Sequence, residues 1–183
     1  MSQPASTSDH LRAGLSGAFA LAVGRREGME AMPADAPGRS FWAVAVCLPA
    51  FVALRMMARS VAGAPDQPLH VMIGAILLFV IGWAGYAVLS HRIAGVLDRA
   101  PLWPRYIVAW NWCNVAQYAL FLVASVPGLL GVPDWVNQVV SLIAVFCALW
   151  LEWDVARLAL QIGAMPAVLM VAVDVLIGLL LAG

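Results

Sequence analysis

The stretch that most constrains the fold runs from Tyr106 to Ser125 and contains no charged residue. As a helix rising about 1.5 Å per residue, these 20 residues would cross roughly 30 Å of hydrocarbon. The same stretch carries polar side chains that a helix surrounded by lipid would avoid, and most of them fall on one arc of a helical wheel. They are Asn111, Asn114, Gln117 and Tyr118. Amides in hydrocarbon need hydrogen-bond partners, so we expect this face to point at other helices.

The composition places the chain among integral membrane proteins. Of its 183 residues, 63% are hydrophobic and 11% are charged, whereas an ordinary soluble domain is roughly 45–50% apolar and about 25% charged. A chain of this length is too small to bury several long apolar stretches in a soluble core. The formal net charge is zero, which argues against nucleic acid as a partner. The three cysteines all lie in apolar stretches, and we expect buried, reduced thiols at Cys47, Cys113 and Cys147.

The apolar stretches predict an all-α, polytopic integral membrane helical bundle with five transmembrane helices. The predicted spans are residues 40–57, 71–90, 106–125, 136–153 and 162–182. Residues 1–39 are predicted to form a cytoplasmic tail whose amphipathic helix, beginning near Leu11, lies in the membrane interface. A short cytosolic helix packed on the bundle is the alternative for that segment. Residues 91–105 are predicted to form an amphipathic surface segment, and the third span is predicted to stop at Pro127.

The placement of the arginines predicts the orientation in the membrane. With the N-terminus in the cytoplasm, eight arginines fall on the cytoplasmic side and only Arg55 and Arg59 fall on the other. Five spans then place the C-terminus in the periplasm. All 10 basic residues are arginine, a bias typical of a GC-rich genome, and we expect the inner membrane of a bacterium.

Two groups of charged side chains stand out. Asp174 lies well inside the last span, where an aspartate opposes insertion by about 2.5–3.5 kcal/mol, and it shares a stripe with small residues. We therefore expect Asp174 to turn inward, protonated or bonded to an amide. The second group closes the fourth span at its cytoplasmic end and consists of Glu152, Asp154 and Arg157. Their spacing permits an ion pair between Asp154 and Arg157 and a cation–π contact between Trp153 and Arg157.

Three sequence segments resemble bacterial proteins related to the Yip family. They are PRYIVAWNW entering the third span, LEWDVARLAL closing the fourth and VAVDVLIGLLL in the last. The resemblance implies a five-span fold that works in membrane trafficking and shaping and has no enzymatic activity. The acidic, proline-bearing segment that precedes the spans in eukaryotic members is not evident here, where the chain reads MPADAPG. A small-GTPase partner is therefore not expected.

Three functions fit these observations. The first is a non-enzymatic bundle that organises the membrane or partner proteins, its partners being membrane lipids, other membrane proteins or a second copy of the chain. The second is a small transporter or channel component, with Asp174 and the arc of amides along a polar path. No internal repeat of spans supports an inverted-repeat carrier. The third is an accessory subunit of a larger complex, or a lipid-active enzyme that uses Glu152, Asp154 or Asp174.

An enzyme, a metal site and a cofactor are not expected. The sequence shows no Ser/His/Asp set, no paired catalytic carboxylates and no His-rich group. His70 and His91 bracket the second span and would lie about 31 Å apart along a helix, too far to share a metal ion or a haem. The polar residues of the spans would serve equally well as contacts between helices, at about 1 kcal/mol or less per hydrogen bond.

Overall fold

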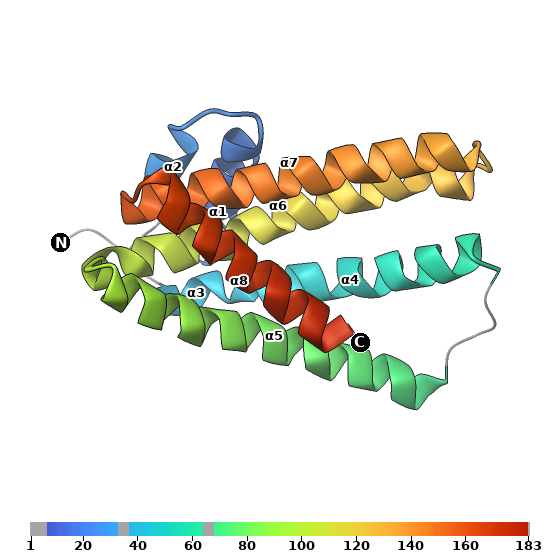
Figure 1. Cartoon of the computed structure of the whole chain (residues 1–183), viewed down its shortest axis with the longest axis horizontal. Helices are drawn as coiled ribbons and strands as arrows, with labels where there is room; N and C mark the ends of the chain where they lie inside the picture. The colour runs from blue at the N-terminus through green and yellow to red at the C-terminus, as the bar shows by residue number, and fades with distance from the viewer. Residues whose placement is uncertain (1–6, 33–36, 64–67, 183) are drawn as a thin grey trace.

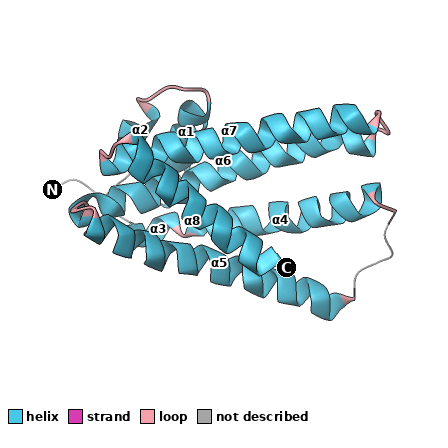
Figure 2. Ribbon diagram, viewed as in Figure 1, coloured by secondary structure: helices cyan, strands magenta, loops and turns pink. Residues whose placement is uncertain are grey.

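The computed structural model describes residues 7–32, 37–63 and 68–182, and every regular element among them is a helix (Figure 2). Five helices are long and apolar enough to cross a membrane and lie together as a bundle (Figure 1). They are α4 (Trp42–Val61), α5 (Leu69–Val96), α6 (Trp103–Leu129), α7 (Asp134–Leu160) and α8 (Ala164–Ala182). The predicted all-α, multi-pass membrane architecture is confirmed.

The short elements lie near one end of the bundle (Figure 1). They are α1 (Thr7–Ala22), α2 (Gly28–Ala31), α3 (Pro37–Ser40) and a single 3-10 turn, Ala100–Leu102. Within the tail predicted over residues 1–39, residues 1–6 and 33–36 lie outside the described residues.

The other helices are arranged around α6. It packs along α7 and α4, and its first half also contacts α1 and α3. Every residue from Tyr106 to Cys113 is buried. A helix covered on most sides needs no single apolar stripe, and this is why polar and aromatic side chains alternate freely in that stretch. The prediction that the amide-bearing span forms the centre of the bundle is confirmed.

The helices extend beyond the predicted spans. α5 continues through His91 to Val96, so the surface segment predicted over residues 91–105 is wrong for its first part. α6 begins at Trp103, with Pro104 in the first turn, where a missing N–H breaks no helical hydrogen bond. The same helix continues past Pro127 to Leu129, and α7 runs to Leu160 instead of ending near residue 153. Hydropathy marks where a helix leaves hydrocarbon, whereas these helices keep their backbone hydrogen bonds for another one or two turns.

α1 packs on α6 through its small residues. A Cβ added to Gly14 would lie 2.3 Å from the Trp112 ring, so only glycine permits this close approach. Ala18 and Leu21 are buried on the same side, while Phe19 remains 48% exposed. This is the packed arrangement predicted as the alternative for the segment, and it leaves an apolar side chain available to the membrane interface.

The thiols divide into two classes. Cys47 and Cys113 are buried, as predicted, whereas Cys147 is exposed on α7. The prediction for Cys147 was wrong because an apolar stretch that spans a membrane is exposed on its lipid-facing side.

Candidate intramembrane site

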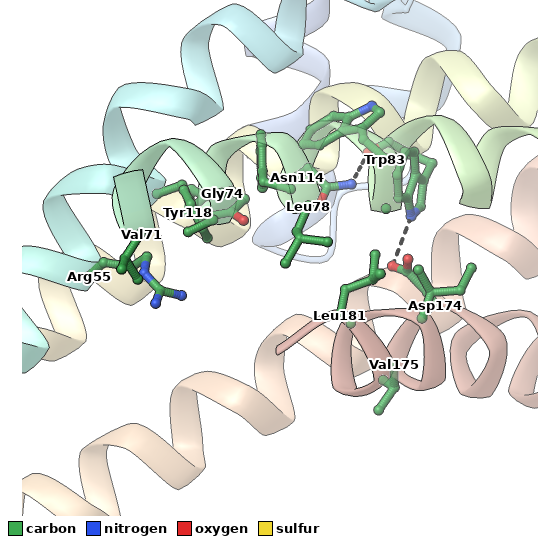
Figure 3. A pocket seen from close by; sticks show the side chains of 17 residues that line it. Arg55, Val71, Gly74, Leu78, Trp83, Asn114, Tyr118, Asp174, Val175 and Leu181 are labelled. Atoms are coloured by element: carbon green, nitrogen blue, oxygen red, sulfur yellow. Dashed lines mark hydrogen bonds between the residues drawn. The ribbon is translucent and has the colours of Figure 1, made fainter. Parts of the chain in front are cut away.

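A pocket of about 550 Å³ lies between α4, α5, α6 and α8 (Figure 3). This volume suits a small organic molecule. Its lining along α5 extends from Val71 to Trp83, about 18 Å of helix. Aromatic rings supply much of the wall: Phe51, Phe79, Trp83, Trp110 and Tyr118. Three further polar or charged side chains line it: Arg55, Asn114 and Asp174.

Asp174 is held at one end of the pocket by a tryptophan. The indole Nε1 of Trp110 donates a hydrogen bond to Oδ2 of Asp174 over 3.3 Å, a bond drawn in Figure 3. Ala167 and Met170, which precede Asp174 on the same stripe of α8, are fully buried. α8 therefore turns this stripe toward the bundle, as the sequence predicted, and Asp174 meets both protein and pocket.

Glu152 of α7 lies beside Asp174, a neighbour that the predicted group of Glu152, Asp154 and Arg157 did not include. The carboxyl group of Glu152 lies within interaction range of the Asp174 carboxyl group and of the Trp110 indole. Glu152 is only 5% exposed, and its Oε1 has no hydrogen-bond partner among the described residues. Glu152 is buried and Asp174 is half-buried. Two carboxylates this close repel each other, and this repulsion favours a pair that keeps at least one proton.

The three charged residues predicted to form one group at the end of the fourth span, Glu152, Asp154 and Arg157, have separate surroundings in the structure. Asp154 is buried on α7, two residues beyond Glu152 and so on a different face of the helix. The guanidinium carbon of Arg157 lies 4.5 Å from the centre of the Trp153 ring, which confirms the predicted cation–π contact. In the part of the chain that the structure describes, Arg157 forms no ion pair with Asp154. None of the three lines the pocket, and Glu152 lies beside the pocket-lining Asp174.

A pair of tyrosines extends the set of buried polar groups. The hydroxyls of Tyr86 and Tyr106 share a hydrogen bond, and Tyr86 also donates one to the carbonyl oxygen of Met170 over 3.3 Å. Both side chains are fully buried and lie within electrostatic range of Glu152. Sequence reasoning missed both tyrosines because each looks like an ordinary aromatic residue of an apolar span. The one feature that could have pointed to them is the hydroxyl group, which needs a hydrogen-bond partner when a tyrosine is buried.

Asn111 is a structural connection between three helices. It is fully buried, its Oδ1 accepts a hydrogen bond from Trp83 Nε1 over 2.7 Å, and its Nδ2 donates one to Ser40 Oγ over 2.7 Å. Each group of the Asn111 amide therefore has a protein partner, and the residue ties α6 to α5 and α3.

The rest of the predicted polar arc is shared between pocket and helix contacts. Asn114 and Tyr118 line the pocket together with Asp174, and Asn114 also donates to the Trp110 carbonyl of its own helix over 2.9 Å. Gln117 points elsewhere and donates to the Ala148 carbonyl of α7 over 3.1 Å. The structure thus brings Asn114, Tyr118 and Asp174 together and assigns Asn111 and Gln117 to helix packing.

Within residues 7–32, 37–63 and 68–182, no three His, Cys, Asp or Glu side chains group as a metal site would require. Comparison with protein-family models, with curated proteins and with solved structures finds no match to this chain. The resemblance to the Yip family therefore stays a prediction that depends on the sequence phrases.

Proposed function

We propose that this chain is a non-enzymatic protein of a bacterial inner membrane that binds a small amphiphilic molecule in the pocket and moves it through the membrane. The observation that carries this proposal is the position of Asp174 in the pocket wall, where it accepts a hydrogen bond from Trp110 and lies within interaction range of the buried Glu152. Acidic side chains inside spans are costly and commonly mark proton or substrate pathways. A fold that needed only helix contacts would gain as much from apolar side chains of similar volume.

The polar groups lie at different depths along the bundle. Arg55, near the end of α4, and Asp174 occupy opposite ends of the pocket (Figure 3). Tyr106 follows Arg105 at the start of α6, on the side predicted to be cytoplasmic. In the proposed orientation, the pocket opens in the periplasmic half of the bundle, and the carboxyl pair lies between it and the cytoplasmic end.

This orientation is testable with a reagent that does not cross membranes. In a cysteine-free background, Ser60→Cys on α4 should react with an impermeant maleimide in intact cells, whereas Ser16→Cys on α1 should react only after the cells are broken. Both serines are exposed in the structure. Labelling of both positions from the same side would contradict the proposed orientation.

Filling the pocket tests the proposed function directly. Gly74 lines the pocket, and a Cβ there would meet no atom within 4 Å, so Gly74→Leu fills the space without a clash. Gly85→Leu on the same helix is the matched control, because a Cβ there also meets no atom and the residue does not line the pocket. In proteoliposomes supplied with a panel of labelled amphiphiles, Gly74→Leu should slow pocket-dependent uptake about tenfold or more. Equal rates in both variants would contradict the proposal.

The packing of α1 favours a second candidate, membrane organisation of the Yip type. α1 is fixed to α6 while Phe19 and Val23 remain exposed, which would let them enter the interface beside the bundle. Its partners would be membrane lipids, other membrane proteins or a second copy of the chain. Under this hypothesis, replacing both residues by serine abolishes any reshaping of liposomes seen by electron microscopy, while Gly74→Leu leaves it intact. Co-purification of one stoichiometric partner would favour an accessory-subunit role instead.

A further inference from the structure

The acidic end of the pocket has no basic partner of its own. Among the described residues, no arginine or histidine forms an ion pair with Asp174 or Glu152. Arg55 lies at the opposite end of the pocket (Figure 3), its guanidinium carbon 5.7 Å from the centre of the Phe51 ring. Together with the unpartnered Oε1 of Glu152, this arrangement leaves a negative charge on the pair without a counter-ion from the protein.

The pocket walls between Asp174 and the Arg55 end are aromatic. The ring centres of Trp83 and Trp110 lie 5.1 Å apart, those of Phe79 and Trp83 5.5 Å, and those of Phe79 and Tyr118 6.0 Å. Aromatic faces attract cations, and organic ammonium groups are recognised in this way. The same rings offer apolar surface to a hydrophobic body attached to the charge.

The alternatives to an organic cation fit less well. A small inorganic cation such as Ca²⁺ needs six to eight oxygen ligands, and the pair offers two carboxyl groups beside indole rings. The negative charge of an anionic molecule would be repelled near Asp174. Such a molecule could place its charged group only at the Arg55 end of the pocket.

We propose that the pocket binds a hydrophobic organic cation and that binding exchanges this cation for one proton of the Asp174–Glu152 pair. This inference rests on the proposed function of the pocket and specifies its ligand. In the exchange, one carboxyl O–H bond breaks, its proton leaves to water, and the carboxylate that forms pairs with the cation. The net charge of the buried site is the same before and after, so no uncompensated charge enters the membrane.

The other titratable groups that face the pair are weaker acids. α5 contributes the phenol of Tyr86, and α6 contributes the phenols of Tyr106 and Tyr118 and the thiol of Cys113. α4 contributes Arg55, at the far end of the pocket, and the buried thiol of Cys47 near Tyr118. Phenols and thiols are intrinsically weaker acids than carboxylic acids, so the carboxyl pair is the group that exchanges its proton.

Equilibrium binding of labelled tetraphenylphosphonium to the purified full-length protein tests this exchange. One-for-one exchange makes the affinity rise with pH, by about tenfold per pH unit as long as the free pair is protonated, with about one proton released per bound cation in weakly buffered solution. Asp174→Asn and Glu152→Gln should each weaken binding about tenfold or more and flatten its pH dependence. Asp154→Asn is the matched control, because Asp154 is a buried acid on the same helix as Glu152 and lies outside the pair.

Three results would overturn the inference: no binding of tetraphenylphosphonium by the wild type, binding without proton release, or unchanged binding by both amide variants. If an amide variant fails to fold, the proton released by the wild type decides the question. Binding of an anionic lysolipid that Gly74→Leu abolishes would reject the cation and leave the proposed pocket function standing. If neither probe binds in a way that Gly74→Leu changes, the proposed function fails as well.

Discussion

The two sides of the bundle are packed differently, and the difference separates structural from functional polar residues. In α6, which lies at the centre of the bundle and also forms part of the pocket wall, 56% of the most apolar stretch is buried, compared with 17% in α5. On the dense side, Asn111 has a protein partner for each group of its amide. Beside the pocket, Glu152 keeps an oxygen without any partner among the described residues. This contrast supports the proposal that Asn111 joins helices and that the carboxyl pair serves a ligand.

The strongest test of this contrast is Gly14→Leu on the dense side. Because a Cβ at Gly14 would lie 2.3 Å from Trp112, the larger side chain must separate α1 from α6. We expect a loss of about 3 kcal/mol or more in the free energy of unfolding. Gly85→Leu, where a Cβ meets no atom within 4 Å, should change it by about 0.5 kcal/mol or less. Unfolding by sodium dodecyl sulfate in mixed micelles measures both, and equal losses would remove the distinction between the two sides.

The next largest effect is expected for Asn111→Ala. This change leaves the Trp83 indole and the Ser40 hydroxyl without their partner, which should cost about 1–2 kcal/mol in the same unfolding measurement. Asn114→Ala removes only a bond to the carbonyl of its own helix and should cost less. A larger loss for Asn114→Ala would show that pocket residues also hold the fold together.

Asp174→Asn should have a small effect on stability and a large one on function. The amide oxygen can still accept the Trp110 hydrogen bond, so we expect a change of about 1 kcal/mol or less in the free energy of unfolding. Uptake that depends on the pocket should be lost, because an amide cannot release a proton. An abundant and fully active Asn variant would remove the transport interpretation of this site.

The smallest effect is expected for Gln117→Ala. Its single hydrogen bond to the Ala148 carbonyl joins α6 and α7, which already pack along much of their length. Such bonds average about 0.6 kcal/mol in membranes. If the free energy of unfolding fell by several times this value, the interface between α6 and α7 would depend on polar contacts more than on packing.

The sequence was sufficient to predict the features that the hydrocarbon core of a bilayer imposes on any chain that crosses it. Five apolar stretches predicted the five membrane-spanning helices, and the cost of a buried acid predicted that Asp174 turns inward. Helix ends were less predictable, because residues such as His91 and Leu160 lie in helical turns beyond the apolar core.

The carboxyl pair could not be predicted from the sequence. Glu152 and Asp174 are 22 residues apart on different helices, and their contact depends on how α7 and α8 rotate and cross. Helical periodicity predicts which residues share a face of one helix. It does not predict which faces of two helices pack against each other. Because Glu152, Asp154 and Arg157 are close in sequence, the prediction treated them as one group of charged residues.

The length of α5 has a consequence for the lipids around the protein. Its 28 residues measure about 42 Å, roughly 12 Å more than the hydrocarbon thickness of a typical bilayer. The surplus turns, including Arg92, must stand among the phospholipid headgroups or tilt. A bilayer of longer acyl chains would cover more of these turns, and a thinner one would expose them. Acyl-chain length would thereby adjust how deeply the protein sits in its host membrane.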